Sequence, residues 1–560
     1  MPARSRLPAT LVATRLSFDR GASTILKDVS LTVAPTSCVG VVGPNGVGKS
    51  TLLQLLAGLE LPDAGSVRLD PPAATVGYLT QEHEHRPGET VRAALYRQTG
   101  VAAAEAELAA AGEALGAAEA GADDRFALAL ERYEGLSAAD LDARIAGTFD
   151  DLGLPAGLAD RDAATLSGGQ AARVALAAIV LSRFDITLLD EPTNDLDFDG
   201  LRRLEAFVDG RQGAMVIVSH DRAFLDATVT SVLELSEHDG TGRLFGGGWS
   251  AYLEERATAR RQEEQSYAVN QSQRRELADR ARRERQWATS AVRRERRDPR
   301  DHDKAQRDFR INRTEKLASR ARQTERAIDR LDHLDKPWEG WDLRFTIEQA
   351  PRAGAVVARF DGAVIERGDF RLGPVTLEIG WAERIGLVGP NGSGKTSFVQ
   401  ALLGRLPLAA GTAWLGPSVV VGELGQDRRP ATGPAAPDGG GSSVLDAVIE
   451  RCGLTVPEAR SLLAKFGLGA EHLRRPRALL SPGERTRAEL AMFQARQVNF
   501  LVLDEPTNHL DVPAVEQIEE ALSGFDGTVL LVSHDRRLLD AVDLTRRIDL
   551  GEPAATWARR

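Results

Sequence analysis

Short apolar runs recur along this chain in two series, one in each half. In the first half these runs are Leu11–Phe18, Val29–Val33, Cys38–Val42, Val180–Leu189 and Val216–Val218. In the second half the matching runs are Arg384–Val388, Phe500–Leu503 and Val529–Val532. Near-continuous runs of β-branched and aliphatic residues are typical of strands that are buried on both faces of a parallel sheet. Because the same order occurs twice, the pattern predicts an α/β fold with two similar domains.

The stretch between the two series, from Ala251 to Leu334, has a different pattern. It contains no Gly and one Pro, it is rich in Ala, Arg, Gln and Glu, and its apolar residues are too sparse to bury a core. Pro299 lies in the breaker cluster Asp298–Asp303. We therefore expect a helical hairpin that runs out to about Arg297 and returns from about Lys304. At about 1.5 Å per residue, the first arm would be about 70 Å long.

Charge sets this stretch apart from the rest of the 560-residue chain. Between Arg256 and Arg330 there are 23 Lys and Arg against 13 Asp and Glu, whereas the whole chain has a net charge of −11. A basic strip in an acidic protein indicates either a solvated spacer between two domains or a probe whose arginines contact nucleic-acid phosphates. The candidate RNA contacts lie around the expected turn: Arg293, Arg294, Arg296, Arg297, Arg300, Lys304, Arg307 and Arg310.

Composition narrows the class of protein. With 42% hydrophobic residues, the chain has room for two or three domains that each have a core. No apolar stretch reaches the ~18 residues of a membrane span, and no apolar run follows Arg4 and Arg6 as it would in a secretory signal. Cys38 and Cys452 are too few for a disulfide framework or a zinc site, so we expect them to be small core residues in a reducing cytoplasm.

Each half carries a Gly-rich loop between an apolar run and a helix-like segment. Both loops match G-x-x-x-x-G-K-[ST], first at Gly43–Ser50 and again at Gly389–Thr396. In such a loop, backbone N–H groups surround phosphate oxygens, the Lys contacts the terminal phosphates, and the hydroxyl binds Mg²⁺. The predicted ATP-binding residues are Gly43, Asn45, Gly46, Gly48, Lys49, Ser50 and Thr51, and in the second half Gly389, Asn391, Gly392, Gly394, Lys395, Thr396 and Ser397.

Two further motifs follow these loops in the same order. An apolar run ends in Asp190-Glu191 in the first half and in Asp504-Glu505 in the second. This arrangement places the first carboxylate of each pair by the metal ion and the second by the attacking water. Each pair is followed by Ser-His-Asp at the end of another apolar run. A lone histidine there would be read as structural, but the repetition makes His220 and His534 candidate ligands of the γ-phosphate.

Upstream of each acidic pair lies a third motif, Leu166-Ser167-Gly168-Gly169-Gln170 and Leu480-Ser481-Pro482-Gly483-Glu484. Together the motifs resemble the Walker A, signature, Walker B and switch-histidine sequences of ATP-binding cassettes, present twice. The resemblance implies that two cassettes pack head to tail, so that the signature of one caps the ATP held by the other. The signature residues implied to contact ATP are Ser167, Gly168, Gly169 and Gln170, and Ser481, Gly483 and Glu484. Gln81 and Gln426 look like the Q-loop glutamines, implied to bind Mg²⁺ together with Ser50, Thr396, Asp190 and Asp504.

The signature motifs imply that the two ATP sites are unequal. Pro482 and Glu484 replace the Gly and Gln of the first signature. Proline lacks an N–H donor, and glutamate adds a negative charge near the phosphates. We therefore expect unequal turnover at the two sites.

The residue that stacks on adenine also differs between the halves. Phe18 is placed like the stacking aromatic of the family, and the equivalent position in the second half falls near Val364 or Ile365. Phe360 and Phe370 are the aromatic residues nearby, and the sequence does not choose between them.

Two cassettes joined by a long charged hairpin resemble the F family of ATP-binding cassette proteins, from about Leu11 to Leu550. The junction Gly246–Glu255 also looks like that family's entry into its linker. Members of the family are ATP-regulated translation factors that bind the ribosome, with the linker reaching toward the P-site tRNA and the peptidyl-transferase centre. The implied partners are the 70S ribosome, its rRNA and the P-site tRNA, bound by a monomer without a membrane subunit.

The resemblance also implies domain boundaries: a first cassette over residues 1–248, the hairpin over 249–340 with its tip at 298–304, and a second cassette over 341–560. From Walker A to signature there are 118 residues in the first half (Lys49 to Ser167) and 86 in the second (Lys395 to Ser481). The extra residues lie in an Ala- and Glu-rich segment at about 101–151, which we expect to be helical. A short arm with a long linker resembles the branch that protects ribosomes from antibiotics.

The implied mechanism is that ATP closes the cassettes and directs the hairpin toward RNA, and that hydrolysis, with Glu191 and Glu505 orienting water, releases the ribosome. Three other functions share parts of this pattern. A housekeeping translation factor would carry the same motifs, but its expression in a sensitive host would not change drug susceptibility. A transporter ATPase would not need an Arg-rich hairpin of this length. A DNA-repair or chromosome ATPase would show zinc-ligand cysteines or hundreds of coiled-coil residues.

Overall fold

In a computed structural model of the chain, both halves of the repeat form a central, mainly parallel sheet. The structure describes residues 8–21, 23–80, 86–211, 213–297, 351–368, 370–425, 443–476, 479–508 and 510–552. The chain divides into two units, one made of Met1–Tyr252 with Leu343–Arg560 and one made of Leu253–Asp342. The first unit contains both halves of the repeat, and the second contains the charged stretch.

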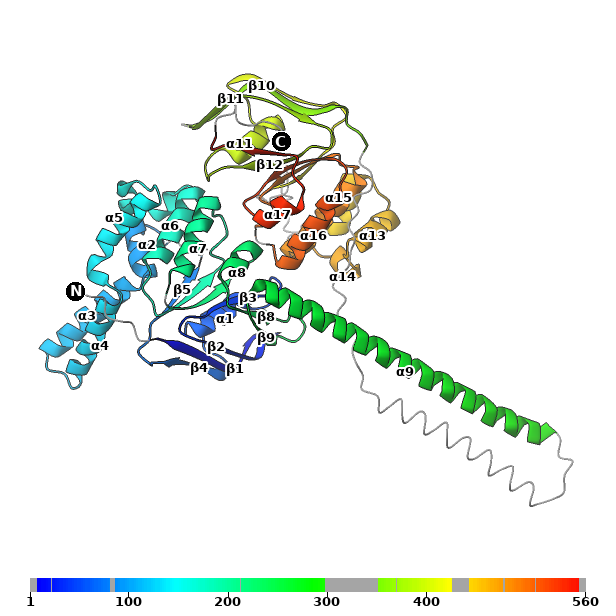
Figure 1. The fold of residues 1–560 in the computed structure, drawn as a ribbon, viewed down its shortest axis with the longest axis horizontal. Coiled ribbons are helices and arrows are strands. Elements are labelled where there is room, and N and C mark those ends of the chain that lie inside the picture. Colours follow the sequence, from blue (N-terminus) through cyan, green and yellow to red (C-terminus); the bar gives the residue numbers. More distant parts are fainter. Residues whose placement is uncertain are drawn as a thin grey trace, which may run out of the picture. The chain divides into compact units, whose positions relative to one another are not determined.

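The N-terminal half, drawn from blue to green in Figure 1, has a six-stranded sheet in the order β5-β6-β7-β3-β8-β9. Only the last pair, β8 and β9, is antiparallel. The strands are β5 (Val76–Thr80), β6 (Ile186–Asp190), β7 (Ala214–Val218), β3 (Cys38–Val42), β8 (Ser231–Leu235) and β9 (Gly242–Gly246). A second, antiparallel sheet has the order β2-β1-β4, with β2 (Ser23–Val33), β1 (Thr10–Arg20) and β4 (Ala64–Asp70).

The C-terminal half repeats this design in yellow to red (Figure 1). Its five-stranded sheet, β14-β15-β16-β12-β17, is parallel throughout. The strands are β14 (Val421–Leu424), β15 (Phe500–Asp504), β16 (Thr528–Val532), β12 (Arg384–Val388) and β17 (Arg546–Asp549). The antiparallel sheet is β11-β10-β13, with β11 (Phe370–Gly380), β10 (Val356–Arg367) and β13 (Ala410–Leu415). The α/β fold predicted from the repeated apolar runs is therefore confirmed.

Helices follow the strands in the same order in both halves. In the N-terminal half they are α1 (Lys49–Leu56), α2 (Val91–Gln98), α3 (Val101–Gly116), α4 (Ala122–Gly135), α5 (Leu141–Asp151), α6 (Gly168–Leu181), α7 (Phe198–Asp209) and α8 (Arg222–Thr228). In the C-terminal half they are α11 (Lys395–Leu402), α12 (Val444–Cys452), α13 (Val456–Lys465), α14 (Ala470–Leu473), α15 (Pro482–Ala495), α16 (Val512–Ser523) and α17 (Arg536–Ala541). Short 3-10 turns cover Ala138–Asp140, Ala156–Asp160 and Ala163–Thr165.

In the C-terminal half the central strands are buried because one face of the sheet packs against β10, β11 and α11 and the other against α15 and α16. In the N-terminal half, β1, β2 and α1 pack against β3, β6 and β7. All five residues of β3 and of β7 are buried, as are all five of β15 and of β16. Cys38 is one of them, and burial raises the pKa of its thiol to about 12. Strand ends that carry polar motifs therefore lie at one edge of each sheet, where parallel strands bring their carboxyl ends together.

The segment expected to be helical at 101–151 contains α3, α4 and α5, and α3 packs against α4. Arg125 and Glu107 form an ion pair of 2.7 Å between these two helices. Arg144 attaches the segment to the rest of the half, because its guanidinium donates to the carbonyls of Leu136, Ser137 and Leu181.

The second unit is described through α9 (Trp249–Arg297), a single helix of 49 residues that begins within the first unit. The first arm of the predicted hairpin is therefore helical, whereas the expected tip at 298–304 and the returning arm lie outside the described residues. Trp249 and Tyr252 are buried at the start of α9, where Tyr252 stacks edge-on against Phe245 at 5.1 Å. Among the helices that the structure describes, none combines the length and apolarity needed to span a membrane.

Candidate functional site

Each Gly-rich loop leads directly into a helix whose first residue is the motif lysine. α1 begins at Lys49 and α11 at Lys395, and the glycine before each lysine has a left-handed backbone, with φ of 104° at Gly48 and 90° at Gly394. A side chain is excluded at both positions, because a Cβ would lie 2.6 Å from Ile25 or 2.3 Å from Phe370. The loops therefore present backbone N–H groups and a helix N-terminus to the same space.

Both motif lysines are held by carbonyls of their own loops. Lys49 Nζ donates to the carbonyl of Gly43 at 2.8 Å, and Lys395 Nζ donates to the carbonyl of Gly389 at 2.8 Å. Burial lowers the pKa of each ammonium, and the acidic residues nearby partly offset this effect. A phosphate placed in the loop would supply the full counter-charge that these lysines lack.

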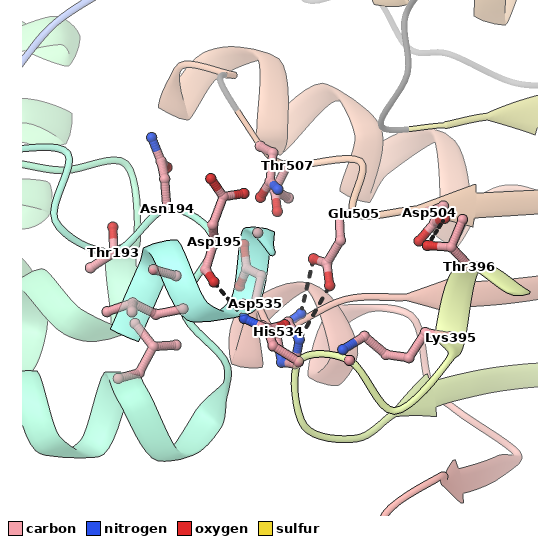
Figure 2. A pocket seen from close by; sticks show the side chains of 18 of the residues that line it. Thr193, Asn194, Asp195, Lys395, Thr396, Asp504, Glu505, Thr507, His534 and Asp535 are labelled. Carbon is pink, nitrogen blue, oxygen red and sulfur yellow. Dashed lines mark hydrogen bonds and ion pairs between the residues drawn. The ribbon is translucent and has the colours of Figure 1, made fainter. Parts of the chain in front are cut away.

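The acidic pairs stand at the carboxyl ends of β6 and β15. In the second half, the Thr396 hydroxyl donates to Asp504 at 3.0 Å, so a hydroxyl and a carboxylate lie side by side (Figure 2). These hard oxygen donors fit Mg²⁺. In the first half, Asp190 accepts a hydrogen bond of 3.0 Å from the Tyr78 hydroxyl. Ser50 occupies the first turn of α1, at the position that Thr396 has in α11.

The second acidic residue of each pair is strained and enclosed. Glu191 has a φ of 51° and Glu505 a φ of 49°, a left-handed conformation that is rare for residues other than glycine. Burial, with some help from the neighbouring aspartates, raises the pKa of Glu191 to about 7 and that of Glu505 to about 8. A glutamate with a pKa near neutrality is suited to orient water and accept a proton.

A histidine faces each of these glutamates. His220 Nε2 lies 3.1 Å from Glu191 Oε1, and His534 Nε2 lies 3.4 Å from Glu505 Oε1, as the dashed lines of Figure 2 show for the second pair. Burial and the nearby lysines lower the pKa of both imidazoles to about 3, so both rings are neutral. In the described part of the chain, neither ring nitrogen of either histidine has a hydrogen-bond partner. Glu191 Oε2 and Glu505 Oε1 likewise accept no hydrogen bond from the described residues.

Buried polar atoms without partners are costly, so such a cluster indicates a place for a polar ligand. A cavity of about 640 Å³ lies at the second cluster and is lined by both halves of the chain (Figure 2). Lys395, Thr396 and Glu505 line it from the C-terminal half, and Gly168 and Gly169 line it from the N-terminal half. This is the composite arrangement that the resemblance implies for the second site.

Hydrogen bonds join the halves at the loops, and one of them runs from the side-chain amide of Asn391 to the carbonyl of Asp195 at 2.6 Å. The backbone N–H of Asn391 donates to Asp197 Oδ2 at 2.9 Å, and that of Asn45 donates to Asp511 Oδ2 at 3.2 Å. The same aspartates cap α7 and α16 through their other oxygens. We call the constellation around Lys49 site one and that around Lys395 site two.

The chain is similar to known proteins over most of its length. The family model described as ABC transporter matches residues 26–194 and again residues 372–508. The ABC transporter F family member 2 of Arabidopsis thaliana is 31% identical over 541 residues, which cover 93% of this chain and 73% of that protein. The chain belongs to the ABC-F family.

Two further relatives carry functional names. The tylosin resistance ATP-binding protein TlrC of Streptomyces fradiae is 38% identical over 92% of this chain and 92% of its own. The energy-dependent translational throttle protein EttA of Mycobacterium tuberculosis is 32% identical over 93% of this chain and 88% of its own. The ABC-F protein described here is thus an ATP-binding, ATP-hydrolysing protein with two cassettes.

The signature helices of the two cassettes begin in the same way. Ser167 accepts from the N–H of Gln170 at 3.3 Å, and Gln170 accepts from the N–H of Ser167 at 3.1 Å. Ser481 and Glu484 repeat this capping box at 3.2 and 2.8 Å. Pro482 is the first residue of α15, where a helix needs no N–H donor. Pro482 has no backbone N–H, whereas Gly168, its equivalent at the start of α6, has one.

The charge of Glu484 is matched locally, which the sequence does not reveal. Glu484 Oε1 lies 3.0 Å from His472 Nε2, on α14. Although burial opposes it, the backbone bond from Ser481 and the attraction of His472 together lower the pKa of Glu484. Glu484 is therefore ionised, and its carboxylate contacts the N–H of Ser481 at the helix cap and the His472 ring.

The structure decides between the two candidate aromatic residues of site two. Phe360 is fully buried and packs edge-on against Phe398 at 5.1 Å, so it cannot reach a ligand. Phe370 lines the cavity and lies against the loop at Gly394. In the first cassette, Phe18 is half-buried, pairs in register with Leu26 and packs against the core.

Sequence reasoning missed the residues that join the cassettes. Asp197 and Asp511 are the last residues of two similar eight-residue segments that begin with the acidic pairs, Asp190–Asp197 and Asp504–Asp511, and that repetition is the signal by which the sequence could have revealed them. The arginine after each Ser-His-Asp forms a cross-cassette ion pair. Arg222 pairs with Glu519 on α16, and Arg536 pairs with Glu205 on α7 at 3.0 Å. These two pairs occupy equivalent positions in the repeat.

Several predicted residues cannot be placed. Gln81 and Gln426, the Q-loop candidates, lie outside the described residues, as do Arg300, Lys304, Arg307 and Arg310. Arg293, Arg294, Arg296 and Arg297 lie on α9, but their side chains are also outside the described part. The remaining motif residues lie where they were expected along α1, α11, α6 and α15, with Gly46 and Gly392 in the loops and Thr51 and Ser397 buried in the first helical turns.

Proposed function

We propose that this ABC-F protein binds the bacterial 70S ribosome and protects it from an antibiotic, using ATP to control when it binds. In this proposal, the cationic strip of 256–330 contacts rRNA and the P-site tRNA. The observation that carries the proposal is the composite site around Lys395, lined by both cassettes, in a chain whose strongly basic stretch lies between the cassettes and begins as the long helix α9. The name of the relative TlrC, a tylosin resistance protein, supports the resistance role.

Within the sites, the proposed roles follow the geometry. Lys49 and Lys395 exchange their loop carbonyls for ATP phosphates, and the neutral histidines donate to the γ-phosphate. Glu191 and Glu505 orient the attacking water and accept its proton. Ser50, Asp190 and Gln81, and Thr396, Asp504 and Gln426, are the proposed holders of Mg²⁺, which would neutralise charge on the phosphates. ATP that touches both cassettes binds the closed state best and so shifts the population toward it.

The direct test uses the double variant Glu191→Gln/Glu505→Gln. This variant should bind ATP without hydrolysing it, so it should co-sediment with 70S ribosomes when ATP is present and separate from them when ADP replaces it. The matched control carries Lys49→Ala and Lys395→Ala in addition, and it should remain free in both nucleotides. A double variant that is equally free of ribosomes with ATP and with ADP would refute the proposal.

A second candidate is a housekeeping translation factor, which the similarity to the translational throttle protein EttA favours. Expression in a drug-sensitive bacterial host separates the two. We expect the wild-type protein to raise the inhibitory concentration of tylosin or another ribosome-directed drug, and the Glu191→Gln/Glu505→Gln variant to lose this effect. Unchanged susceptibility to every such drug, combined with ATP-dependent ribosome binding, would assign the housekeeping role and a cytoplasmic location.

A further inference from the structure

Two short helices follow the switch histidines and lie against each other. α8 begins directly after Ser219-His220-Asp221 and α17 directly after Ser533-His534-Asp535, and the two helices are in contact. Asp221 accepts from the N–H of Ala223 and Phe224, and Asp535 accepts from the N–H of Leu538. These caps join each helix firmly to its histidine, so a displacement of the histidine segment displaces the helix as well.

One residue of α8 contacts both the other cassette and the start of α9. Asp226 Oδ1 accepts from the Ser250 hydroxyl at 2.8 Å, and Asp226 Oδ2 pairs with Arg537 Nη2 at 3.3 Å. Ser250 is the second residue of α9, between the buried Trp249 and Tyr252. A single carboxylate therefore holds the root of the long helix and the segment that follows the second switch histidine.

This contact breaks the pseudo-symmetry of the repeat. Two of the ion pairs between the cassettes are equivalent in the repeat, namely Arg222–Glu519 and Arg536–Glu205. The third pair, Arg537–Asp226, has no equivalent. The position equivalent to Arg537 is Ala223, so Asp540, which is equivalent to Asp226, meets no arginine there. Asp226, the carboxylate of this additional pair, lies on the cassette that leads into α9. Both of its side chains are about one-third exposed, which suits a contact that forms and breaks reversibly.

We propose that Asp226 is a positioning residue that couples the nucleotide state of site two to the root of α9. When ATP at site two fixes the segment of His534, α17 presents Arg537 to Asp226, and the bonded Ser250 holds the first turn of α9 in one orientation. When site two opens, Arg537 withdraws and Asp226 is left with Ser250 alone. The inference deepens the proposed function, since it names the route by which ATP would control the linker.

Hydrogen exchange tests this route without a ribosome. The parent is Glu191→Gln/Glu505→Gln, measured with and without ATP and Mg²⁺ by mass spectrometry. We expect ATP to slow exchange in peptides of both Gly-rich loops and in the peptide covering 249–260. Adding Asp226→Asn or Arg537→Gln should leave the slowing at both loops unchanged, and this unchanged slowing also shows that the variant is folded. The slowing at 249–260 should fall roughly two- to fivefold, which is the range expected for loss of a partly exposed ion pair.

Ser250→Ala and Asp540→Asn complete the experiment. Ser250→Ala should likewise reduce the slowing at 249–260 while leaving the slowing at both Gly-rich loops intact. Asp540→Asn is the matched control because it changes the equivalent aspartate, which is exposed, and it should leave 249–260 as in the parent. Any of three results would overturn the inference. ATP could slow exchange at 249–260 as much in Asp226→Asn as in the parent, Asp540→Asn could reduce this slowing as much as Asp226→Asn does, or ATP could fail to slow exchange at 249–260 in the parent. Ribosome binding is measured separately, so its failure would refute the proposed function and leave this result standing.

Discussion

The two ATP sites share one template and differ in the groups that close them. Site two is closed by Gly168 and Gly169, and the Cβ of Asn391 lies 3.2 Å from the position that a side chain on Gly169 would occupy. At site one the corresponding Gly483 has its nearest neighbours, Ala514 and Asp511, in its own cassette. Pro482 also removes a donor there. A duplicated site can thus keep its catalytic residues while its caps diverge, and the caps are where unequal turnover would arise.

The first aspartates of the two acidic pairs differ in their surroundings as well. Asp190 receives a hydrogen bond from Tyr78, whereas the equivalent residue in the second cassette is Glu423. Burial is the main cause that raises the pKa of Asp504, and the charge of Glu423 adds to it. Glu423 is itself paired with Arg405. Each aspartate therefore accepts a hydrogen bond from a hydroxyl, that of Tyr78 at site one and that of Thr396 at site two, and Asp504 has the charged Glu423 as a further neighbour.

The largest expected difference comes from removing one water-orienting glutamate at a time. Glu191→Gln and Glu505→Gln should each lower turnover at their own site roughly 10²–10⁴-fold. Because site two has the more complete signature, Glu505→Gln should leave the lower total rate of phosphate release. Equal residual rates for the two single variants in a steady-state ATPase assay would remove the basis for the comparison.

The cross-cassette pairs should differ in their contribution to stability. The side chain of Arg222 is 8% exposed and that of Glu519 is 17% exposed, whereas the values for Arg536 and Glu205 are 38% and 22%. Removing one partner of a buried pair costs about 3 kcal/mol or more, and removing one of a partly exposed pair costs about 1 kcal/mol or less. The free energy of unfolding, measured with denaturant, should therefore be clearly lower for Arg222→Ala than for Arg536→Ala. The exchange Arg222→Glu/Glu519→Arg should recover part of the loss, and a reversed ranking would contradict the burial argument.

Restoring the missing donor should sharpen the comparison of the signatures. Pro482→Gly returns an N–H to the start of α15, and a hydrogen bond to a charged phosphate is worth enough to raise turnover at site one about tenfold. The measurement is made in the Glu505→Gln background, where site one alone turns over. Gly168→Pro in the Glu191→Gln background is the mirror control and should slow site two. No change in either variant would show that these N–H groups do not contact the phosphates.

The smallest expected difference is in pH dependence. Only an ionised glutamate accepts a proton, so turnover should rise with pH as each carboxyl loses its proton and fall as pH drops. With pKa values raised to about 7 for Glu191 and about 8 for Glu505, the midpoint should lie at or below pH 7 at site one and at or below pH 8 at site two. Rates measured from pH 5.5 to 9 in the two single variants test this. The histidines, with pKa values lowered to about 3, should add no inflection in this range.

The sequence by itself determined the repeated α/β fold and the motif residues on each chain segment. The reason is that a phosphate-binding loop is a local requirement: Gly48 and Gly394 supply a backbone conformation, and Lys49 and Lys395 follow in the next position. The same holds for the acidic pairs, because a short buried strand delivers them to a sheet edge whatever else surrounds it. The long helical arm was readable too, since it contains no glycine and few apolar residues.

Only the tertiary structure decided which groups meet across the chain. Phe360 and Phe370 are equally aromatic in the sequence, but Phe360 is buried between β10 and α11 and Phe370 lines the cavity. The pairings of Asn391 with Asp197, Arg222 with Glu519, and Asp226 with both Ser250 and Arg537 join residues separated by 24 to 311 positions. Ion pairs and hydrogen bonds of this kind depend on distance and burial, which no local pattern encodes.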